Sequence, residues 1–552
     1  MKNNNWWRDA VIYQVYPRSF ADSDGDGIGD IPGITSRLDY LHDLGVDAIW
    51  ISPFYDSPLH DGGYDVTDYR EVDPRLGTLA DVDELIAQAH KRDIRVIMDI
   101  VPNHTSSEHE WFQEVLRSEP GSAAWDRYMI RPGKGADHAE PPNNWKSVFH
   151  GGGWSRLKSP DGSPTDFWYL HLFDSTQPDL NWQNPEVRAE FRDILRFWFD
   201  RGIDGFRIDV AHGMVKEEGL PDFDYDDTEP ALLGDAPHAP FWDQDGVHEI
   251  FREWRLVADE YTPPRIFCGE TWVPSPERLA RYQRPDELHT SFNFDYLNAN
   301  WDSEKLRKSI DDTIANHEIV GAPPTWVLSN HDVHRHASRL APVDEAGDRD
   351  LHRGLRRARA LTLFTLSLPG SMYIYQGEEL GLPEVFDLPD EARQDPLWFR
   401  SNHTDIGRDG CRVPLPWSGT ASSYGFGPTP HSWLPQPGQW AELSVEAQQG
   451  QDGSTLEFYR EALRIRKAST ALGGGDLEWL DYVGDVLAFT RTSADGSSII
   501  SVLNLNNDVV HLPIEWGRTA LIASSDDIAF LKTEGNGEFL AVGPETAVWL
   551  TQ

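Results

Sequence analysis

At 552 residues, with 39% hydrophobic residues and 22 tryptophans, the chain can bury a large core and is expected to form about two to four domains. Its formal net charge of −42 repels phosphates, which argues against nucleic acids and anionic membranes as partners and favours a neutral or cationic ligand. Only two cysteines occur, Cys268 and Cys411, so a disulfide framework is excluded and a reducing compartment is indicated.

Two further features predict a soluble protein. The N-terminal segment runs directly into a strand-like stretch and carries no apolar core of a secretion signal. The longest apolar stretch, Leu361 to Tyr375, is too short to cross a bilayer and is interrupted by Pro369 and Gly370. We therefore expect a cytoplasmic location.

Three segments repeat the order of an amphipathic helix followed by an apolar strand. In the first, leucines recur at helical spacing up to Gly45, and the apolar segment 46–52 follows as a strand. The same order recurs in 80–104 and in 190–212. Near-continuous apolar strands alternating with helices indicate a parallel sheet covered on the outside, either doubly wound or closed as a (β/α)₈ barrel.

Five more strands bring the expected number to eight. They are predicted at Val11–Tyr16, Arg265–Gly269, Ser291–Phe294, Thr325–Leu328 and Met372–Tyr375. Eight strands fit an α/β fold of the (β/α)₈ TIM-barrel type. The span exceeds the usual ~250 residues of such a barrel, so insertions are required.

The insertions and the C-terminal segment divide the chain into three predicted domains. Residues 105–178, irregular and rich in Gly, Pro and Trp, are predicted to form an excursion domain B after the third strand. The barrel, domain A, then occupies 1–104 and 179–472, with a second loop-rich insert at about 382–449. Residues 473–552 alternate like antiparallel strands and are predicted to form a C-terminal β domain.

Acidic and basic side chains cluster where the predicted barrel strands end. Strand ends three, four, five and seven carry these candidates: Asp99, Asn103 and His104; Arg207, Asp209 and His212; Glu270; His331 and Asp332. Any one of these acids alone is more often a helix cap than a catalytic group. Because the active site of a (β/α)₈ barrel is built at this rim, four strands that each deliver an acid to it indicate catalysis.

The neighbours of the acids predict different protonation states. Arg207 and Asp209 point the same way from one strand, so the arginine is expected to keep Asp209 ionised, as suits a nucleophile or charge stabiliser. Glu270 follows apolar residues and is the better candidate for a protonated carboxyl. One ionised and one protonated carboxyl are what glycosidic cleavage needs, and Asp332 would bind sugar hydroxyls. Loop aromatics such as Phe149 could stack on a sugar, although most aromatics pack in the core.

Six motifs, in family order, resemble those of the α-amylase family, glycoside hydrolase family 13. They are "DIVPNH" (99–104), "QPDLNW" (177–182), "GFRIDVAH" (205–212), "GET" (269–271), "SNHD" (329–332) and "GSMYIYQGEELG" (370–381). The opening segment, "WWRDAVIYQVYPRSFADSDGDGIGDIPGI", is similar to the oligo-1,6-glucosidase and α-glucosidase branch. The resemblance covers essentially the whole chain.

The resemblance implies a role for each matching residue. Asp209 would be the nucleophile, Glu270 the general acid/base and Asp332 the transition-state stabiliser of a retaining mechanism through a covalent β-glucosyl intermediate. The residues implied to contact the terminal glucose are Asp61, Tyr64, His104, Arg207 and His331. The segment "GRDGCRVPLPW" keeps Arg408 and Arg412 of the branch's "SRD-x-SRTPMQW", and Arg412 matches the arginine that closes the terminal-glucose pocket, which implies exo-action.

The loop "DSDGDGIGD" resembles a calcium-binding loop only in part. Asp22, Asp24 and Asp26 fall at the first, third and fifth positions of a helix-loop-helix calcium loop, but Gly33 stands where the bidentate glutamate is required. From the residues alone, a solvated acidic loop is an equal alternative. The family resemblance implies a structural Ca²⁺, with Mg²⁺ as an alternative, held by Asp22, Asp24, Asp26, the carbonyl of Ile28, and Asp30. No cofactor is expected to take part in catalysis.

The resemblance implies an exo-acting α-glucosidase on short α-linked gluco-oligosaccharides, and leaves the bond type open. Val210 follows the nucleophile, as in several members that prefer α-1,6 bonds, whereas the continuation "AHGM" resembles maltose-acting subgroups. We expect a slight preference for α-1,4 bonds with some α-1,6 activity. A transglucosylase or a trehalose-synthase-like isomerase is the alternative, because a sugar can replace water at the intermediate.

Two other classes are disfavoured. A non-catalytic, transporter-associated scaffold of this fold would carry a membrane helix and lack the catalytic acids. A metal-dependent hydrolase is disfavoured because His104, His212 and His331 lie at three different strand ends without a paired-histidine helix motif. A monomer and a homodimer are both compatible with the sequence.

Overall fold

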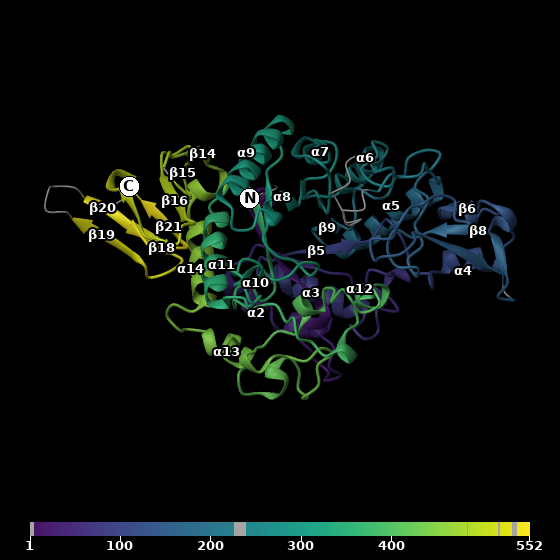
Figure 1. The fold of residues 1–552 in the computed structure, drawn as a ribbon, viewed down its shortest axis with the longest axis horizontal. Coiled ribbons are helices and arrows are strands. Elements are labelled where there is room, and N and C mark those ends of the chain that lie inside the picture. Colours follow the sequence, from purple (N-terminus) through teal and green to yellow (C-terminus); the bar gives the residue numbers. More distant parts are fainter. Residues whose placement is uncertain are drawn as a thin grey trace.

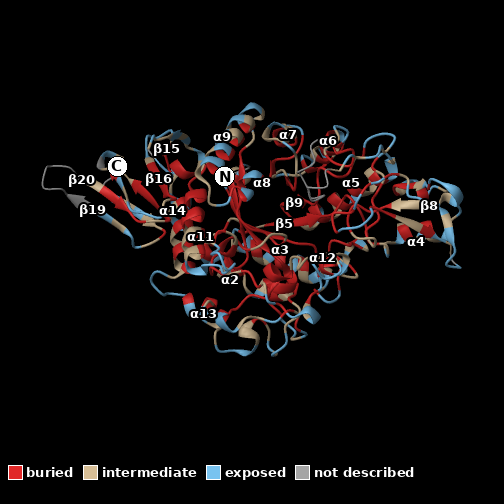
Figure 2. Cartoon of the chain, in the orientation of Figure 1, coloured by how far each residue is buried: buried red, intermediate tan, exposed pale blue. Residues whose placement is uncertain are grey.

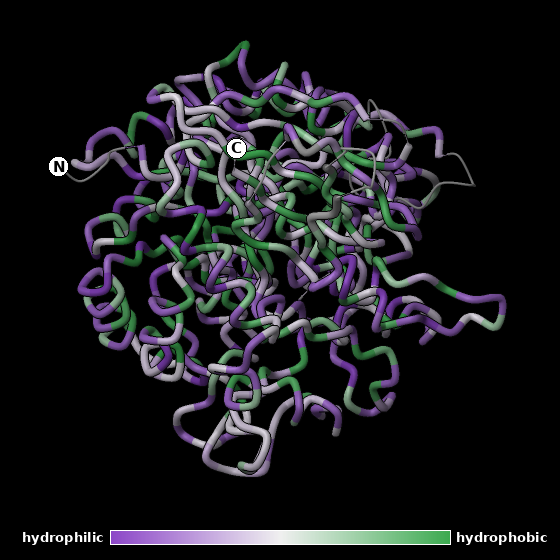
Figure 3. The backbone as a smooth tube through the Cα atoms, turned by 90° about the vertical axis from the view of Figure 1, so that its left-hand side faces the viewer, coloured by the Kyte–Doolittle hydropathy of each residue, from purple (hydrophilic) through white to green (hydrophobic). Residues whose placement is uncertain are grey.

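The computed structural model describes residues 5–159, 161–225, 239–482, 484–516, 519–532 and 538–551. An eight-stranded sheet lies at the centre, a three-stranded sheet lies toward one end, and two antiparallel sheets lie toward the other (Figure 1). Hydrophobic segments gather in the interior and hydrophilic ones at the rim (Figure 3).

The central sheet is a parallel barrel whose strands follow chain order around the ring. Its strands are β1 (Val11–Val15), β2 (Ala48–Ile51), β5 (Arg95–Ile100), β9 (Gly205–Ile208), β10 (Ile266–Gly269), β11 (Thr290–Ser291), β12 (Thr325–Val327) and β13 (Ser371–Tyr375). Between β11 and β12 the ring is bridged by the Asn293 N–H, which donates to the Thr325 carbonyl (3.1 Å). A doubly wound sheet would reverse its strand order at a switch point, so the (β/α)₈ barrel prediction is confirmed. Strands β5 and β9 are buried (Figure 2).

Helices follow the strands and cover the barrel. They are α1 (Ile31–Ser36), α2 (Leu38–Leu44), α3 (Leu79–Lys91), α5 (Pro185–Arg201), α6 (Val247–Ala258), α7 (Pro276–Arg281), α8 (Phe294–Asn298), α9 (Ser303–Val320), α10 (His336–Arg339), α11 (Leu351–Leu366) and α14 (Thr455–Ala468). Helix α5 shows how the sequence sets these bounds: the Asn184 side chain caps its start, Pro185 takes the first turn, and Gly202 ends it at φ 107°. Among the described helices, none has both the length and the apolar composition that crossing a bilayer requires.

The sixth barrel strand is shorter than predicted. We expected a strand over Ser291–Phe294, but β11 ends at Ser291 and Phe294 already begins α8. The cause is Asn293, whose side chain accepts a hydrogen bond from the Tyr296 N–H and caps that helix. The chain therefore turns outward at the rim earlier than its apolar pattern indicates.

Two regions outside the barrel frame the site. After β5, the strands β6 (Ile130–Pro132), β7 (Trp154–Lys158) and β8 (Pro164–Leu170) form an antiparallel sheet, preceded by α4 (Glu110–Arg117). The insert after β13 is mostly irregular and contains α12 (Pro396–Arg400) and α13 (Val445–Gln448). Arg400 of α12 joins them, because its guanidinium donates to the carbonyls of Phe149 (3.0 Å) and His150 (2.7 Å).

The C-terminal strands follow α15 (Thr470–Gly474) and form two antiparallel sheets. One contains β14 (Asp476–Trp479), β15 (Val486–Thr492), β16 (Ser498–Asn504), β18 (Thr519–Ala523) and β21 (Thr546–Thr551); the other contains β17 (Val510–Pro513), β19 (Ile528–Lys532) and β20 (Glu538–Val542). Strand β21 packs on α11, where the Trp549 indole N–H donates to the Leu363 carbonyl (3.1 Å). The domain boundaries stay predictions.

Candidate active site

Arg207 lies at the centre of a cluster of three buried acids. Its Nη1 donates to Asp209 Oδ1 (2.7 Å) and to Asp99 Oδ1 (3.0 Å), and its Nη2 donates to Glu270 Oε2 (2.5 Å). The strand register explains the contacts: Arg207 on β9 pairs with Asp99 on β5 and with Cys268 on β10, two residues before Glu270. One guanidinium therefore joins acids from three strand ends.

These contacts set the protonation of the cluster. We expected Arg207 to keep Asp209 ionised, but burial raises the pKa of Asp209 well above its usual range; Arg207 lowers it and the nearby Glu270 raises it. Burial likewise raises the pKa of Asp99 to about 7, against the opposing charge of Arg207. At Asp209 and Asp99, burial therefore outweighs the opposing charge of the single guanidinium.

Glu270, predicted to be the protonated carboxyl because apolar residues precede it, is surrounded by hydrogen-bond donors. Its Oε2 accepts from Arg207 and from the Val210 N–H (3.1 Å), and its Oε1 accepts from the Trp272 indole N–H (3.0 Å). Two of these donors come from β9 and the residues just after it, which the sequence before Glu270 does not reveal. Val210 points its N–H at Glu270 from a backbone with φ 42°, a strained conformation for a β-branched residue.

Asp332 is held by two arginines and lies beside a histidine. Its Oδ1 accepts from Arg412 Nη2 (3.0 Å) and Arg408 Nη1 (3.1 Å), and its Oδ2 lies 3.2 Å from His331 Nε2. Burial alone would raise the pKa of Asp332, but His331, Arg408 and Arg412 together hold it well below its usual range. Asp332 is therefore ionised.

Arg408 links two of the predicted acids, a role that the sequence analysis did not assign. It donates to Asp61 Oδ1 (2.8 Å) as well as to Asp332, and Asp395 fixes it through a further bond to Nε (2.7 Å). Arg412 lies behind Asp332, buried, with Nε donating to the His331 carbonyl (2.9 Å). The sequence retained Arg408 in its motif, but its contact with Asp61 depends on the fold.

Asp61, Tyr64 and His104 lie together beside Arg408 and Asp332. Asp61 Oδ2 accepts from Gln177 Nε2 (3.0 Å), and His104 Nε2 lies 3.2 Å from the same nitrogen. Tyr64 stacks on His331 (centroids 5.2 Å apart, planes at 8°) and donates to Asp99 Oδ2 (3.1 Å). Burial lowers the pKa of His104 to about 4, so it is neutral. Gln177 was not predicted as a site residue, although it opens the "QPDLNW" motif.

A cavity of about 540 Å³ opens over these residues, a size typical of small-molecule sites. The predicted residues that line it are Asp61, Tyr64, His104, Phe149, Asp209, Glu270 and Asp332. The other three, Arg207, His331 and Arg412, are buried and touch the lining acids from behind. Phe149 lies under the guanidinium of Arg408, whose central carbon is 5.0 Å from the ring centroid.

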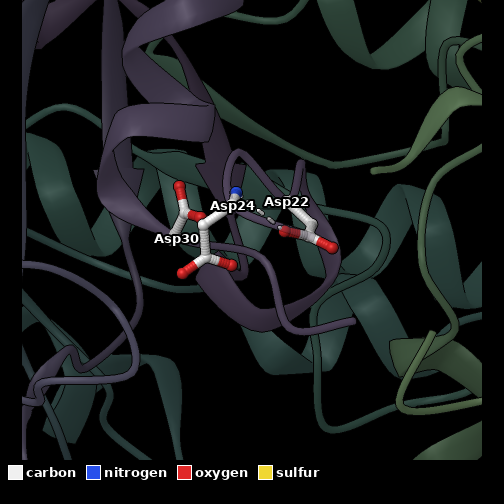
Figure 4. Close-up of side chains that lie close together, drawn as sticks. All are labelled: Asp22, Asp24 and Asp30. Carbon is white, nitrogen blue, oxygen red and sulfur yellow. Dashed lines mark hydrogen bonds between the residues drawn. The ribbon is translucent and has the colours of Figure 1, made fainter. Parts of the chain in front are cut away.

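Three acids of the N-terminal loop converge apart from this cavity. Asp22, Asp24 and Asp30 each place a carboxylate oxygen within 4.8 Å of the other two (Figure 4). Asp26 is not among them, and its Oδ1 accepts from the Ile28 N–H (2.7 Å). An all-oxygen donor set of this kind fits a hard cation such as Ca²⁺ or Mg²⁺.

Comparison with known proteins identifies the family. The family model described as "Alpha amylase, catalytic domain" matches residues 14–475. The chain belongs to the α-amylase family. It is 38% identical to a probable alpha-glucosidase of Rhizobium meliloti (strain 1021), over 92% of this chain and 90% of that protein. It is 36% identical to an oligo-1,6-glucosidase of Parageobacillus thermoglucosidasius, over 90% of each chain.

Solved structures agree over nearly the full length. The crystal structure of the alpha-glucosyl transfer enzyme XgtA is 36% identical, covers 99% of each chain and superposes with a TM-score of 0.85. As a member of the α-amylase family, the chain is a glycoside hydrolase, and the recognition made from its six motifs is confirmed. A carbohydrate substrate follows from the family; the cytoplasmic location and the exclusion of nucleic acid stay predictions.

The buried Asp61 predicts a pH-dependent stability. Burial raises the pKa of Asp61 to about 6, although Arg408 and Arg412 oppose this. In the unfolded chain its pKa returns to about 4, so between these values the folded state binds the proton more tightly. The free energy of unfolding of the wild type relative to Asp61→Asn should therefore fall as pH rises from about 4 to 6, by roughly 3 kcal/mol at most. Urea unfolding of both proteins at each pH measures this; a constant or rising difference would contradict it.

Proposed function

We propose that the protein is an exo-acting, retaining α-glucosidase that releases glucose from the non-reducing end of short α-linked gluco-oligosaccharides. One observation carries the proposal. Arg207 contacts both Asp209 and Glu270, which line the cavity, and Arg408 bridges Asp61 and Asp332, which line the same cavity. Relatives named alpha-glucosidase and oligo-1,6-glucosidase support it.

The reaction divides into two steps between these acids. Glu270 gives its proton to the departing glycosidic oxygen while the Asp209 carboxylate attacks the anomeric carbon, so the glycosidic bond breaks as an ester bond forms. A water molecule then gives a proton to Glu270 and attacks the same carbon, which restores the α configuration and frees Asp209. A guanidinium in contact with both carboxylates favours the short separation of the retaining type.

The charge that develops on the sugar suits this cycle. Burial raises the pKa of Asp209, and positive charge developing on the sugar favours its ionised form. Asp332, kept ionised by its cations, stabilises the same positive charge.

The charged end of the cavity supports exo-action. Arg408 bridges Asp61 and Asp332, and these charged groups would bind the hydroxyls of the terminal sugar. Above them, Arg400 binds the loop of Phe149, and His150 Nε2 lies 3.4 Å from Asp405 Oδ2. These contacts hold the excursion domain and the insert together over the terminal-glucose pocket.

Bond preference is tested by the rates on maltose and isomaltose. We expect kcat/KM for maltose to exceed that for isomaltose by less than about tenfold, a difference of at most about 1.4 kcal/mol in transition-state binding. Val210 lines the cavity beside Asp209. The variant Val210→Thr, which has nearly the same shape, tests whether this residue sets the bond preference. Faster cleavage of isomaltose would reverse the assignment. Longer sugars with little free glucose would favour the transglucosylase alternative, which the likeness to XgtA also supports.

We also propose that the N-terminal loop binds a structural divalent cation, Ca²⁺ or Mg²⁺, through Asp22, Asp24 and Asp30, with Asp26 and the Ile28 carbonyl completing the set. Such an ion would neutralise the loop's acids and supply no chemistry to the reaction. At a concentration one hundred times its Kd, it should raise the melting temperature of a chain of this length by roughly 2 °C. Asp24→Asn should lose this shift and keep kcat on maltose within about twofold. An unchanged melting temperature of the chelator-treated wild type on adding either ion would contradict the site.

A further inference from the structure

The His331 ring is fully buried and packed against aromatic side chains. Tyr64 stacks on it with centroids 5.2 Å apart and planes at 8°, and Tyr16 stacks on it with centroids 5.8 Å apart and planes at 23°. The indole of Trp50 meets it edge to face, with centroids 5.9 Å apart. These contacts fix the plane of the imidazole, so each ring nitrogen faces a fixed neighbour.

Gln14 of β1 lies against one nitrogen of this ring. Its side chain is buried, and its Nε2 lies 2.7 Å from His331 Nδ1 and 3.2 Å from Ser52 Oγ. An amide nitrogen carries two hydrogens and accepts no hydrogen bond, so its contact with Nδ1 makes that ring nitrogen the acceptor. Gln14 Oε1 has no hydrogen-bond partner among the described residues, so the amide is held through its nitrogen.

The other ring nitrogen faces a group that can only accept. His331 Nε2 lies 3.2 Å from Asp332 Oδ2, and beyond that carboxylate it has no partner in the part of the chain that the structure describes. Asp332 is ionised, because Arg408 and Arg412 hold it. An ionised carboxylate has no hydrogen to donate, so a proton on Nε2 attracts it, whereas a lone pair there repels it.

The imidazole has a single proton to place. Burial lowers the pKa of His331 well below its usual range, Asp332 opposes this, and the neighbouring arginines lower it further, so the ring is neutral. The charged groups that face it are Asp332, Arg207, Arg408 and Arg412. In a neutral imidazole, the partner of one nitrogen decides whether the other nitrogen carries the proton.

We propose that Gln14 is a positioning residue for the reaction: by donating to His331 Nδ1, it places the single imidazole proton on Nε2, toward Asp332. This inference rests on the proposed function, in which Asp332 stabilises the transition state. With the proton on Nδ1 instead, the Nε2 lone pair would repel the carboxylate and displace it from the terminal sugar. Gln14 therefore acts on the sugar through two other side chains.

Nitrogen-15 NMR of the histidine-labelled wild type tests the tautomer directly. The signals of His331 are those that disappear in His331→Gln. We expect a neutral imidazole with Nε2 protonated and Nδ1 unprotonated. A proton on Nδ1, alone or together with one on Nε2, would overturn the proposal.

Gln14→Glu replaces the donor with a group that titrates. While its carboxyl and Nδ1 share a proton, the proton on Nε2 is kept; once the shared proton is lost, the carboxylate draws the remaining imidazole proton from Nε2 to Nδ1. Relative to the wild type, kcat/KM for maltose should therefore lie within about threefold at about pH 5 and be lower by about tenfold or more at about pH 8, the effect of one misdirected buried hydrogen bond.

Gln376→Glu is the matched control. It adds a buried carboxyl just after the neighbouring strand β13, where Gln376 Oε1 accepts from the Tyr16 N–H (2.8 Å) and does not contact His331. This variant should keep the pH profile of the wild type. A loss in Gln14→Glu that is constant from about pH 5 to 8 would assign Gln14 a structural role and overturn the proposal.

The NMR measurement needs no substitution at Gln14, so it decides the question even where Gln14→Glu does not fold. Failure of the wild type to release glucose from maltose would instead overturn the proposed function, and the tautomer of His331 would still be measured.

Discussion

Asp209→Gly is expected to lower kcat on maltose by about 10⁴-fold or more, the effect typical of removing a covalent nucleophile. The variant keeps Glu270, so leaving-group protonation survives, but no ester to the anomeric carbon can form. Azide should occupy the space that the carboxylate leaves and attack from the same face. The expected product is β-glucosyl azide, detected by proton NMR, with activity that rises with azide concentration.

A matched variant separates this loss from misfolding. Burial raises the pKa of Asp209 well above its usual range, so its ionised form is unfavourable in the folded protein. Asp209→Asn should consequently melt at pH 7 at the wild-type temperature or higher while remaining inactive. Retained activity in Asp209→Asn, or an azide product with the α configuration, would show that another group attacks the sugar.

Glu270→Gln should lower kcat/KM for maltose by about 10³-fold, within the range known for general acid catalysis. Fluoride departs without a proton, so kcat/KM for α-glucosyl fluoride should fall by less than about tenfold in the same variant. Steady-state rates on both substrates give the comparison. Equal losses on the two substrates would mean that Glu270 positions the sugar or Arg207 and does not donate the proton.

The barrel could be predicted from the sequence because each strand carries its own signal. The run ending at Ile100 is almost entirely buried, and helices such as α5 have their own cap and stop. The apolar pattern predicted too long a strand at Ser291–Phe294. The Asn293 side chain caps the start of α8 there, so the strand ends earlier than its apolar neighbours indicate.

The acids could be predicted as a group, but their environments could not. Spacing along β9 places Arg207 beside Asp209, whereas the contacts of Arg207 with Glu270 and Asp99 depend on register between strands. Arg408 reaches Asp61 across 347 positions of sequence, which no local pattern encodes.

The order in which the two anomers of glucose appear from maltose tests the central claim most directly. Proton NMR, recorded during the first minutes with enough enzyme to outpace mutarotation, resolves the two anomers. Because Asp209 and water attack opposite faces in turn, α-glucose should appear first at the newly cleaved end. Initial appearance of β-glucose there would contradict the double displacement and the assignment of Asp209 as the nucleophile.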